Sequence, residues 1–206
     1  MKKVWYNNEG FIRSDYIAIH NENNEDVVYI SDFLNDCIRR YDEEGSLINK
    51  ISITKPSGIA VDQNGNLYVA SYATNDNSIY QYDKNGQFIS KWGNSKNSYD
   101  NGQLNTPKGI AIYENFQSKS IFVVDSENNR IQRFTIDGKF IERWGTGNDK
   151  GELNNPRGIN LDDSGNVYIA DSLNKRIQVF NQNGIFQNKW DIYNNYESSR
   201  ILINAE

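Results

Sequence analysis

The sequence predicts an all-β chain made of four copies of one four-stranded unit, and three observations lead to this fold class. A recurring apolar motif begins at Ile17, Ile59, Ile110 and Ile159, at spacings of 42, 51 and 49 residues. Short apolar runs separated by Gly-containing turns are typical of strands joined by hairpins, and no segment places apolar residues at helical spacing. All three prolines occupy one position of the unit, in "KPSG", "TPKG" and "NPRG".

The first strand of each unit follows this Pro-x-Gly motif. Proline is tolerated where a strand begins, because its missing N–H is not needed there. The first unit departs from the pattern, since its strand "YIAIH" has no Pro-x-Gly before it. We expect the first strands at residues 16–20, 58–62, 109–113 and 158–162.

The second strand of each unit is apolar almost throughout and ends in a small or acidic residue, as in "IFVVD" and "VYIAD". Such continuous apolar runs are typical of strands that are covered on both faces. We expect the second strands at residues 28–32, 67–71, 121–125 and 167–171.

The third and fourth strands are joined by a glycine turn and marked by large aromatic residues. The third strands end on Tyr41, Tyr82, Phe134 and Phe180, each four residues before a turn glycine, Gly45, Gly86, Gly138 or Gly184. The fourth strands end on Trp92, Trp144 and Trp190, with Ile51 at that place in the first unit. Glycine turns of this kind connect hairpin strands.

Four antiparallel strands in about 45 residues form the blade of a β-propeller. We therefore expect a single propeller domain over residues 1–206, with four complete repeats at about 14–53, 54–104, 105–153 and 154–191. A partial blade at 1–13 precedes them, and a C-terminal strand or tail at 192–206 follows. The segment "KVWYNNEGFI" (3–12) has the aromatic, turn and apolar residues of an outer hairpin. Its partner is "RILINAE" (200–206) or another polypeptide, which includes self-association that completes the propeller.

The repeats resemble the NHL-repeat family of β-propellers. The segment "NPRGINLDDSGNVYIADSLNKRIQVF" follows that family's pattern almost throughout, and "TPKGIAIYENFQSKSIFVVDSENNRIQRF" follows it well. The resemblance implies a propeller of NHL type. It leaves the function open, because members of this fold bind proteins, bind single-stranded RNA or act as metal-dependent enzymes.

Two segments, "DSENNRIQ" and "DSLNKRIQ", place Arg130 and Arg176 shortly after Asp125 and Asp171. One interpretation is structural: each arginine reaches back to its aspartate and closes the loop with charge-assisted hydrogen bonds. The other is a ring of arginines that face a ligand. We favour the structural interpretation, which also fits the replacement of the arginine by Cys37 in the first unit.

Composition excludes several functional classes. The formal net charge of −5 argues against a general binder of nucleic acid or of membrane surfaces, since both require a positive field. Residues 1–103 carry a net charge of −4 and residues 104–206 a net charge of −1, so the second half can hold a basic patch. No apolar segment follows the first lysines and none is long enough to span a membrane, so we expect no membrane contact. The default expectation is a cytoplasmic protein if Met1 is native, and the localisation is open if the chain is an excised domain.

No catalytic constellation is visible in the sequence. The single histidine, His20, cannot form the multi-histidine zinc site of amidating relatives, and the single cysteine, Cys37, is expected to pack rather than to react. Asn160 stands where the other units have alanine, and is either a satisfied polar group or a metal ligand. "DQNGN" and "DDSGN" are expected to be hairpin turns rather than calcium loops. We expect no enzyme activity, no cofactor and no metal.

The sequence favours a binding scaffold. Strand order predicts that the Pro-x-Gly motifs and the Asn-x-Arg loops share one rim of the propeller. The candidate partner-binding residues on this rim are Lys108, Arg130, Arg157, Lys175, Arg176 and Tyr72. The expected partner is a protein or peptide. Single-stranded RNA is the first alternative, and a metal-dependent lactonase-like enzyme is the second.

Overall fold

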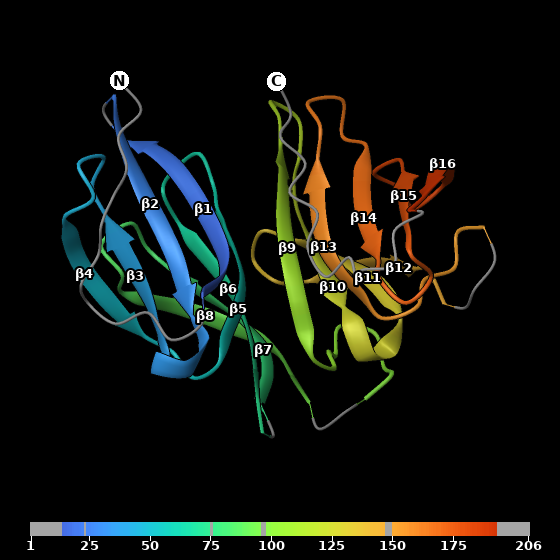
Figure 1. Ribbon diagram of the computed structural model, residues 1–206, viewed down its shortest axis with the longest axis horizontal. Coiled ribbons are helices and arrows are strands. Elements are labelled where there is room, and N and C mark those ends of the chain that lie inside the picture. Colours follow the sequence, from blue (N-terminus) through green and yellow to red (C-terminus); the bar gives the residue numbers. More distant parts are fainter. Residues whose placement is uncertain (1–13, 23, 75, 96–97, 147–149, 193–206) are drawn as a thin grey trace.

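The computed structural model describes residues 14–22, 24–74, 76–95, 98–146 and 150–192, which form four four-stranded antiparallel sheets (Figure 1). Blade 1 comprises β1 (Ser14–Glu22), β2 (Glu25–Asp32), β3 (Cys37–Tyr41) and β4 (Leu47–Ser52). Blade 2 comprises β5 (Pro56–Val61), β6 (Leu67–Ala73), β7 (Asp76–Tyr82) and β8 (Phe88–Ser95). Blade 3 comprises β9 (Pro107–Glu114), β10 (Lys119–Asp125), β11 (Arg130–Thr135) and β12 (Phe140–Trp144). Blade 4 comprises β13 (Pro156–Leu161), β14 (Val167–Asp171), β15 (Arg176–Phe180) and β16 (Phe186–Asp191).

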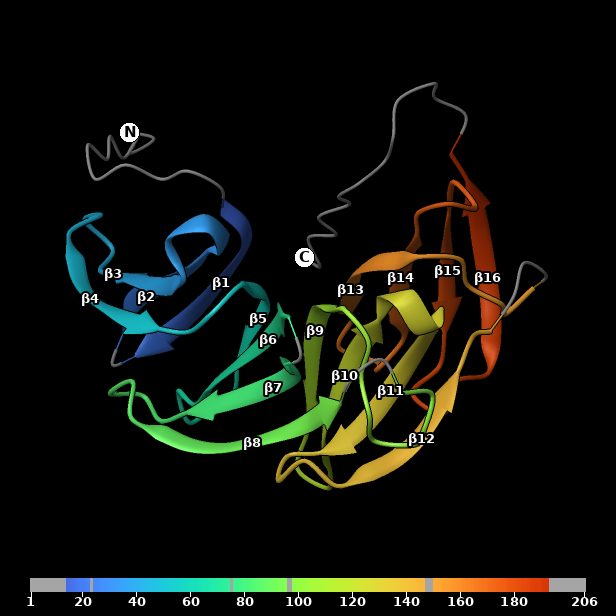
Figure 2. The same ribbon diagram turned by 90° about the horizontal axis from the view of Figure 1, so that it is seen from below.

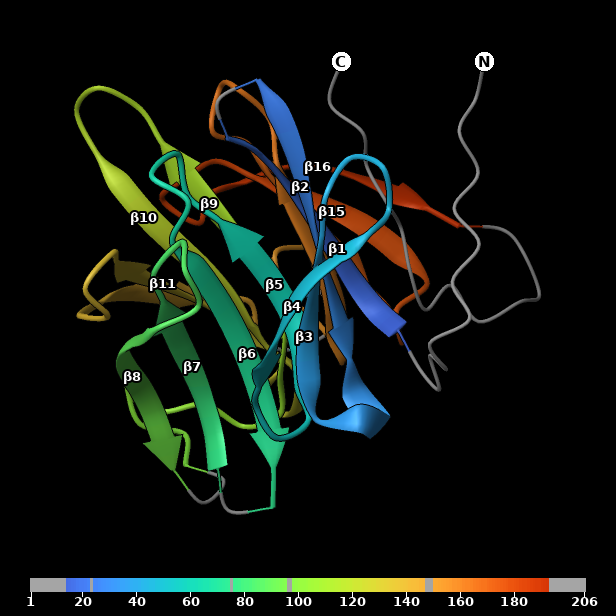
Figure 3. The same cartoon turned by 90° about the vertical axis from the view of Figure 1, so that its left-hand side faces the viewer.

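The prediction of an all-β propeller of four-stranded antiparallel blades is confirmed. In each sheet the strands lie in chain order, as Figure 3 shows for β5 to β8. The helical turns within the described ranges are two short 3₁₀ segments, Phe33–Asn35 and Ser126–Asn128. The inner strands of blades 2 to 4 begin two residues earlier than the sequence predicted, at the prolines, because Pro107 already pairs with Asp125 and Pro156 with Asp171. No described helix is long and apolar enough to cross a bilayer.

The blades stand around the inner strands β1, β5, β9 and β13 in an open arc, with blades 1 and 4 at its two ends (Figure 2). An apolar core fills each of the three spaces between neighbouring blades. Tyr29 and Ile38 of blade 1 pack with Leu67 of blade 2, and corresponding residues pack at the next two interfaces. Each core is therefore shared by two sheets, and no blade has a core of its own.

The inner strands approach one another so closely that the glycine of the Pro-x-Gly motif is required. A Cβ atom on Gly58 would lie 1.9 Å from the carbonyl oxygen of Lys108, and one on Gly109 would lie 2.7 Å from that of Arg157. Tyr16 stands at this position in blade 1, and its hydroxyl donates to the Arg157 carbonyl across the arc at 3.2 Å. The missing Pro-x-Gly motif of blade 1 thus lets a side chain bridge the inner strands of blades 1 and 4.

A polar contact links each blade to the next at the end where the prolines lie. A residue at the start of the third strand, or directly before it, accepts a hydrogen bond through its side-chain oxygen from the backbone N–H just before the next blade's proline. These pairs are Asp36 with Lys55 at 2.9 Å, Asn77 with Thr106 at 3.1 Å, and Asn129 with Asn155 at 2.7 Å. All three donors have positive φ. The corresponding residue of blade 4 is Lys175, which has no acceptor.

Three predictions for the chain ends concern residues outside the described part: the partial blade at 1–13, its hairpin at 3–12, and the C-terminal strand "RILINAE". These remain predictions.

The Asp36 contact predicts a specific acid sensitivity. The hydrogen bond from the Lys55 backbone N–H lowers the pKa of the Asp36 carboxyl below its ordinary value of 3.8. The charged carboxylate therefore stabilises the fold above the unfolded-state pKa, and this contribution is lost as the pH falls through the lower folded-state pKa. The Asp36→Asn side chain still offers an oxygen that can accept this hydrogen bond, as Asn77 and Asn129 do in blades 2 and 3, but it does not titrate.

Above about pH 5 we expect a constant difference in the free energy of unfolding between the wild type and Asp36→Asn. Below about pH 4 the free energy of unfolding of the wild type should fall relative to that of Asp36→Asn. Urea unfolding followed by circular dichroism at a series of pH values measures this difference. Parallel pH curves for the two proteins would contradict the role of Asp36.

Candidate binding rim

The Pro-x-Gly motifs and the loops that follow the second strands lie at one rim of the arc. The register fixes this placement, because Pro56 pairs with Ser71, at the far end of the neighbouring strand, and the prolines of blades 3 and 4 pair in the same way. We call this edge the proline rim. The strand order of the sequence predicted the same arrangement.

Arg130 begins β11 at this rim and is buried, with a relative exposure of 1%. Its Nε donates to Asp125 Oδ2 at 2.6 Å, and its two Nη atoms donate to the carbonyl oxygens of Tyr99, Asp100 and Gln103 at 2.7 to 3.0 Å. Burial raises the pKa of Asp125, against the hydrogen bonds that favour its charged form. Arg130 therefore fastens the loop between blades 2 and 3 onto blade 3.

Blade 4 repeats this network. Arg176 Nε donates to Asp171 Oδ2 at 2.6 Å, and Nη2 donates to the Glu152 carbonyl at 2.6 Å. The structural interpretation of the Asn-x-Arg element is thereby confirmed. Arg130 and Arg176 are buried in loop-anchoring networks, and Arg130 also lines the pocket described below. Their part in partner binding stays a prediction.

Blade 1 also has a buried ion pair, but its arginine occupies a different position. Its aspartate, Asp32, receives a hydrogen bond at 2.8 Å from Nε of Arg39, which lies two residues beyond Cys37 on β3. Blade 2 has neither charge, because Ser71 and Ser78 replace both partners. Among the described blades, a buried aspartate at the end of the second strand occurs only together with a buried arginine on the third strand. Comparison of the repeats did not identify Arg39 as this partner. Asp32 without an arginine at the Cys37 position was the signal that another positive charge must lie nearby.

The other candidate residues are spread around the proline rim. Lys108 on β9 and Arg157 on β13 lie on adjacent inner strands and are partly buried at the mouth of the central channel. Lys175 is exposed in the loop before β15, at the end of the arc. Tyr72 lies near the end of β6, and its ring packs against Phe33 of blade 1 with centroids 5.1 Å apart. The structure brings Lys108 and Arg157 together and leaves Lys175 and Tyr72 apart from them.

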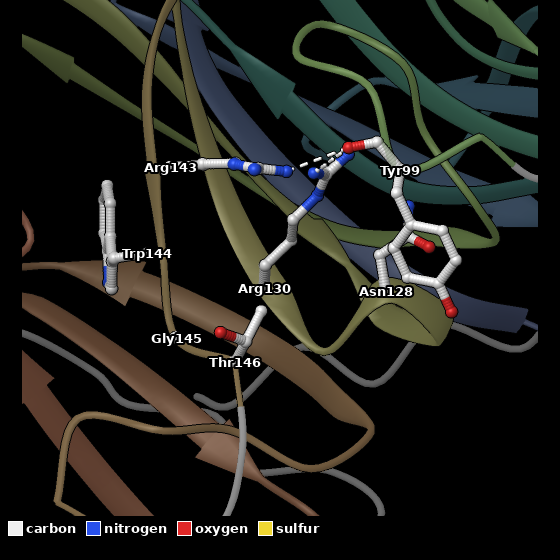
Figure 4. A pocket seen from close by; sticks show the side chains of 7 residues that line it. All are labelled: Tyr99, Asn128, Arg130, Arg143, Trp144, Gly145 and Thr146. Atoms are coloured by element: carbon white, nitrogen blue, oxygen red, sulfur yellow. Dashed lines mark hydrogen bonds between the residues drawn. The ribbon is translucent and has the colours of Figure 1, made fainter.

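A pocket of about 300 Å³ opens on the proline rim of blade 3 (Figure 4). Tyr99 is 68% exposed on one side of it, and Arg143, an exposed residue on β12, donates to the Tyr99 carbonyl at 2.8 Å. Asn128 lines the inner wall and its Oδ1 has no hydrogen-bond partner. Comparison of the repeats missed this pocket, because the loop before blade 3 is longer than the corresponding loop before blade 4 and the stretch with Tyr99 has no counterpart there.

The opposite rim has a different charge. Its turns are predominantly acidic and carry Asp42, Glu43, Glu44, Asp62, Asp83, Asp137, Asp162 and Asp163. The turn aspartates are engaged locally, as in Asp62, whose Oδ1 accepts the N–H groups of Asn64 and Asn66. "DQNGN" and "DDSGN" are thus hairpin turns, as expected. The acidic turns leave the proline rim as the more basic edge of the molecule.

The central channel is lined by apolar residues of the four inner strands and by one polar side chain, Asn160. Asn160 Oδ1 accepts the backbone N–H of Leu161 at 2.9 Å. Within the described ranges, no group of three His, Cys, Asp or Glu residues could hold a metal ion. Cys37 is buried, and this burial raises the pKa of its thiol, which fits a packing role.

The buried pairs predict a large cost for the loss of one partner. Arg130→Met should lower the free energy of unfolding by about 3–5 kcal/mol, because it leaves Asp125 buried without its counter-charge. The double substitution Asp125→Ser and Arg130→Ser, which copies blade 2, should recover part of that loss. Urea unfolding monitored by tryptophan fluorescence measures both. Lys139→Ala, at an exposed ion pair with Asp137, is the control and should leave the midpoint unchanged. A double variant that is less stable than Arg130→Met would contradict this account.

Comparison with known proteins agrees with the repeat pattern. Residues 153–180 match the family model described as NHL repeat, and residues 51–77 match the model described as beta-propeller repeat. Protein brain tumor of Drosophila melanogaster is 32% identical over 113 residues, which cover 54% of this chain and 10% of that protein. Peptidyl-glycine alpha-amidating monooxygenase of Mus musculus is 31% identical over 91 residues, which cover 43% of this chain and 9% of that protein. The chain thus spans about a tenth of the length of these curated relatives.

Solved structures share the architecture at low identity. Virginiamycin B lyase from Staphylococcus aureus is similar with a TM-score of 0.64 and 19% identity, over 86% of this chain and 56% of that chain. A chain of a nidogen/laminin complex is similar with a TM-score of 0.65 and 16% identity, over 86% of this chain and 63% of that chain. These likenesses show the fold alone. Together with the four antiparallel blades, the matches show a β-propeller fold that contains a segment matching the NHL repeat at residues 153–180.

Proposed function

We propose that this chain is a non-catalytic scaffold that binds a protein or peptide at its proline rim. The observation that carries the proposal is the pocket of blade 3, which is lined by the exposed Tyr99 and by Arg143, whose guanidinium donates to the Tyr99 backbone carbonyl (Figure 4). Tyrosine and arginine are the residue types that supply most binding energy at protein interfaces. Lys108 and Arg157 extend the surface to the channel mouth.

Buried hydrogen bonds order the loop that forms the pocket in the absence of a partner. Arg130 is buried, and its guanidinium donates hydrogen bonds to the carbonyl groups of Tyr99, Asp100 and Gln103. Gln132 adds a second anchor, since its side chain donates to the Gln103 carbonyl and accepts the N–H of Gly102. A loop that is already ordered loses less conformational entropy on binding. The buried network thus supports the binding role of the exposed residues above it.

Charge favours an acidic partner. The acidic turns lie at the far rim, whereas Lys108, Arg143, Arg157 and Lys175 lie at the proline rim. A partner segment rich in Asp or Glu would be attracted to the proline rim and repelled from the other, which sets its orientation. A solved propeller of similar fold comes from a nidogen/laminin complex, so this architecture is found in protein assemblies.

Single-stranded RNA is the alternative occupant of the same rim. Binding of RNA without base pairing requires several exposed aromatic rings that stack on successive bases. Within the pocket only Tyr99 offers such an exposed ring, so the observations favour the peptide.

Charge reversal on the proline rim should abolish peptide binding. We expect the triple variant Lys108→Glu, Arg143→Glu and Arg157→Glu to weaken binding of fluorescent acidic peptides at least about tenfold, because it removes the basic groups that face the partner. Fluorescence anisotropy against acidic and basic peptide pools measures the affinity. The matched control, Lys84→Glu, Lys119→Glu and Lys139→Glu, changes the net charge equally but acts at the acidic rim, and should bind as the wild type does.

Equal binding by the two triple variants, both with wild-type circular dichroism, would refute the proline rim as the site. Binding of oligouridylate that falls steeply with salt, without binding of acidic peptides, would replace the peptide by RNA. A stoichiometric divalent cation found by metal analysis, and lost in Asn160→Ala, would overturn the non-catalytic assignment in favour of a metal-dependent enzyme.

A further inference from the structure

One basic position of the repeat is paired differently in blades 2, 3 and 4. Three residues of the fourth strands occupy this position, each opposite a residue of the third strand: Lys91 opposite Tyr80, Arg143 opposite Gln132, and Lys189 opposite Gln178. In blade 2 the Lys91 ammonium nitrogen lies 3.1 Å from Asp76 Oδ2. In blade 4 the Lys189 ammonium nitrogen lies 3.2 Å from Asp191 Oδ1. Arg143 of blade 3 forms no ion pair with a residue that the structure describes.

Blade 3 lacks the carboxylate that blade 2 provides at this place. Asp76 of blade 2 stands four residues before Tyr80. The residue four positions before Gln132 in blade 3 is Asn128, whose amide carries no charge. Its Nδ2 donates to Asp125 Oδ2 at 3.0 Å, so this amide belongs to the neighbouring buried network. The exchange of a carboxylate for an amide therefore leaves a cation at the rim of blade 3 without its counter-charge.

The Arg143 side chain is held with one edge of its guanidinium available. Its Nη1 donates to the Tyr99 carbonyl at 2.8 Å (Figure 4). Nε and Nη2 have no hydrogen-bond partner among the described residues, and the side chain is exposed. These two nitrogens carry parallel N–H groups that match the two oxygens of a carboxylate. Because the bond to Tyr99 already restricts the side chain, binding of a carboxylate would cost it little further conformational entropy.

The charges around the pocket favour an anion at the same place. Arg130 and Arg143 both donate to the Tyr99 carbonyl, at 2.7 and 2.8 Å, so two positive charges lie close together. The ion pair with Asp125 compensates the charge of Arg130 only. A bound anion would compensate the second charge and reduce the repulsion between the two guanidinium groups. The pocket of about 300 Å³ that Arg143 lines has room for an acidic side chain.

We propose that the pocket of blade 3 takes up the side-chain carboxylate of an acidic residue of the partner, which binds the Nε–Nη2 edge of Arg143. The partner thereby supplies from outside the carboxylate that Asp76 supplies within blade 2. Asp76 is itself an aspartate side chain, so the template within this chain favours an acidic side chain over a chain end. The inference rests on the proposed function, because it names the group of the partner that the pocket recognises.

Two fluorescent peptides with blocked ends test the contact on the full chain: one alternates serine with aspartate, the other serine with asparagine. The wild type should bind the aspartate peptide at least about tenfold more tightly, because a carboxylate is the stronger acceptor for a guanidinium. In Arg143→Gln this preference should fall at least about fivefold. Arg143→Lys keeps the charge but not the paired N–H groups, so its preference should fall as well. Lys139→Gln, at an exposed ion pair of the acidic rim, is the control and should keep the wild-type preference.

Both Arg143 variants should remain folded by circular dichroism, because Arg130 still binds the carbonyl groups of the Tyr99 loop. An undiminished preference in Arg143→Gln would overturn the Arg143 contact. If the triple charge-reversal variant nevertheless loses the aspartate peptide, the proline rim remains the binding site.

Three other results would also overturn the inference. A wild type without preference for the aspartate peptide would overturn it together with the proposed function. A preference that Arg143→Lys retains in full would reduce Arg143 to a general positive charge. Tighter binding of a serine–asparagine peptide with a free C-terminal carboxylate would assign the pocket to a chain end.

Discussion

The two apolar faces of each blade are the constraint on which the rest of the structure depends. A four-stranded sheet with both faces apolar cannot be stable in water by itself, so each blade must be covered by its neighbours. The three cores between blades meet this requirement with the same residues each time, such as Tyr68 and Ile79 from one sheet and Phe134 from the next. The stacking fixes the position of the inner strands, and the inner strands in turn require glycine at Gly58 and Gly109.

Stacking of the sheets does not fix the loops that connect the blades. The buried ion pairs fix them by hydrogen bonds to the loop backbone. Arg130 and Arg176 satisfy carbonyl groups of the loops that lead into their own blades, while Asp125 and Asp171 accept backbone N–H groups from the same loops. A charge in this position is tolerated only with its partner, which explains why blade 2 lost both charges together. The pocket of blade 3 is formed by a loop that one of these networks holds, so the order of the loop and the shape of the pocket have one physical origin.

The molecule is asymmetric in two directions, from one rim to the other and along the arc. From rim to rim, charge changes from the mixed, more basic proline rim to the acidic turns. Along the arc, blades 2 and 3 each present an aromatic pair to the next blade, and the turn glycine of that next blade packs against it. This second asymmetry makes the two ends of the arc unlike.

The sequence by itself determined what repeats within a blade. Alternating apolar runs, turn glycines and prolines depend on neighbours close in the chain, so strand order, the Pro-x-Gly position and the structural role of Arg130 were predictable. Contacts between blades were decided only by the tertiary structure. Arg39 takes over the role expected at the Cys37 position, Arg143 meets the loop of Tyr99, and Tyr16 reaches Arg157 across the arc. The physical reason is that periodicity reports the environment of a position averaged over the repeats, whereas these contacts arise where one repeat departs from the others.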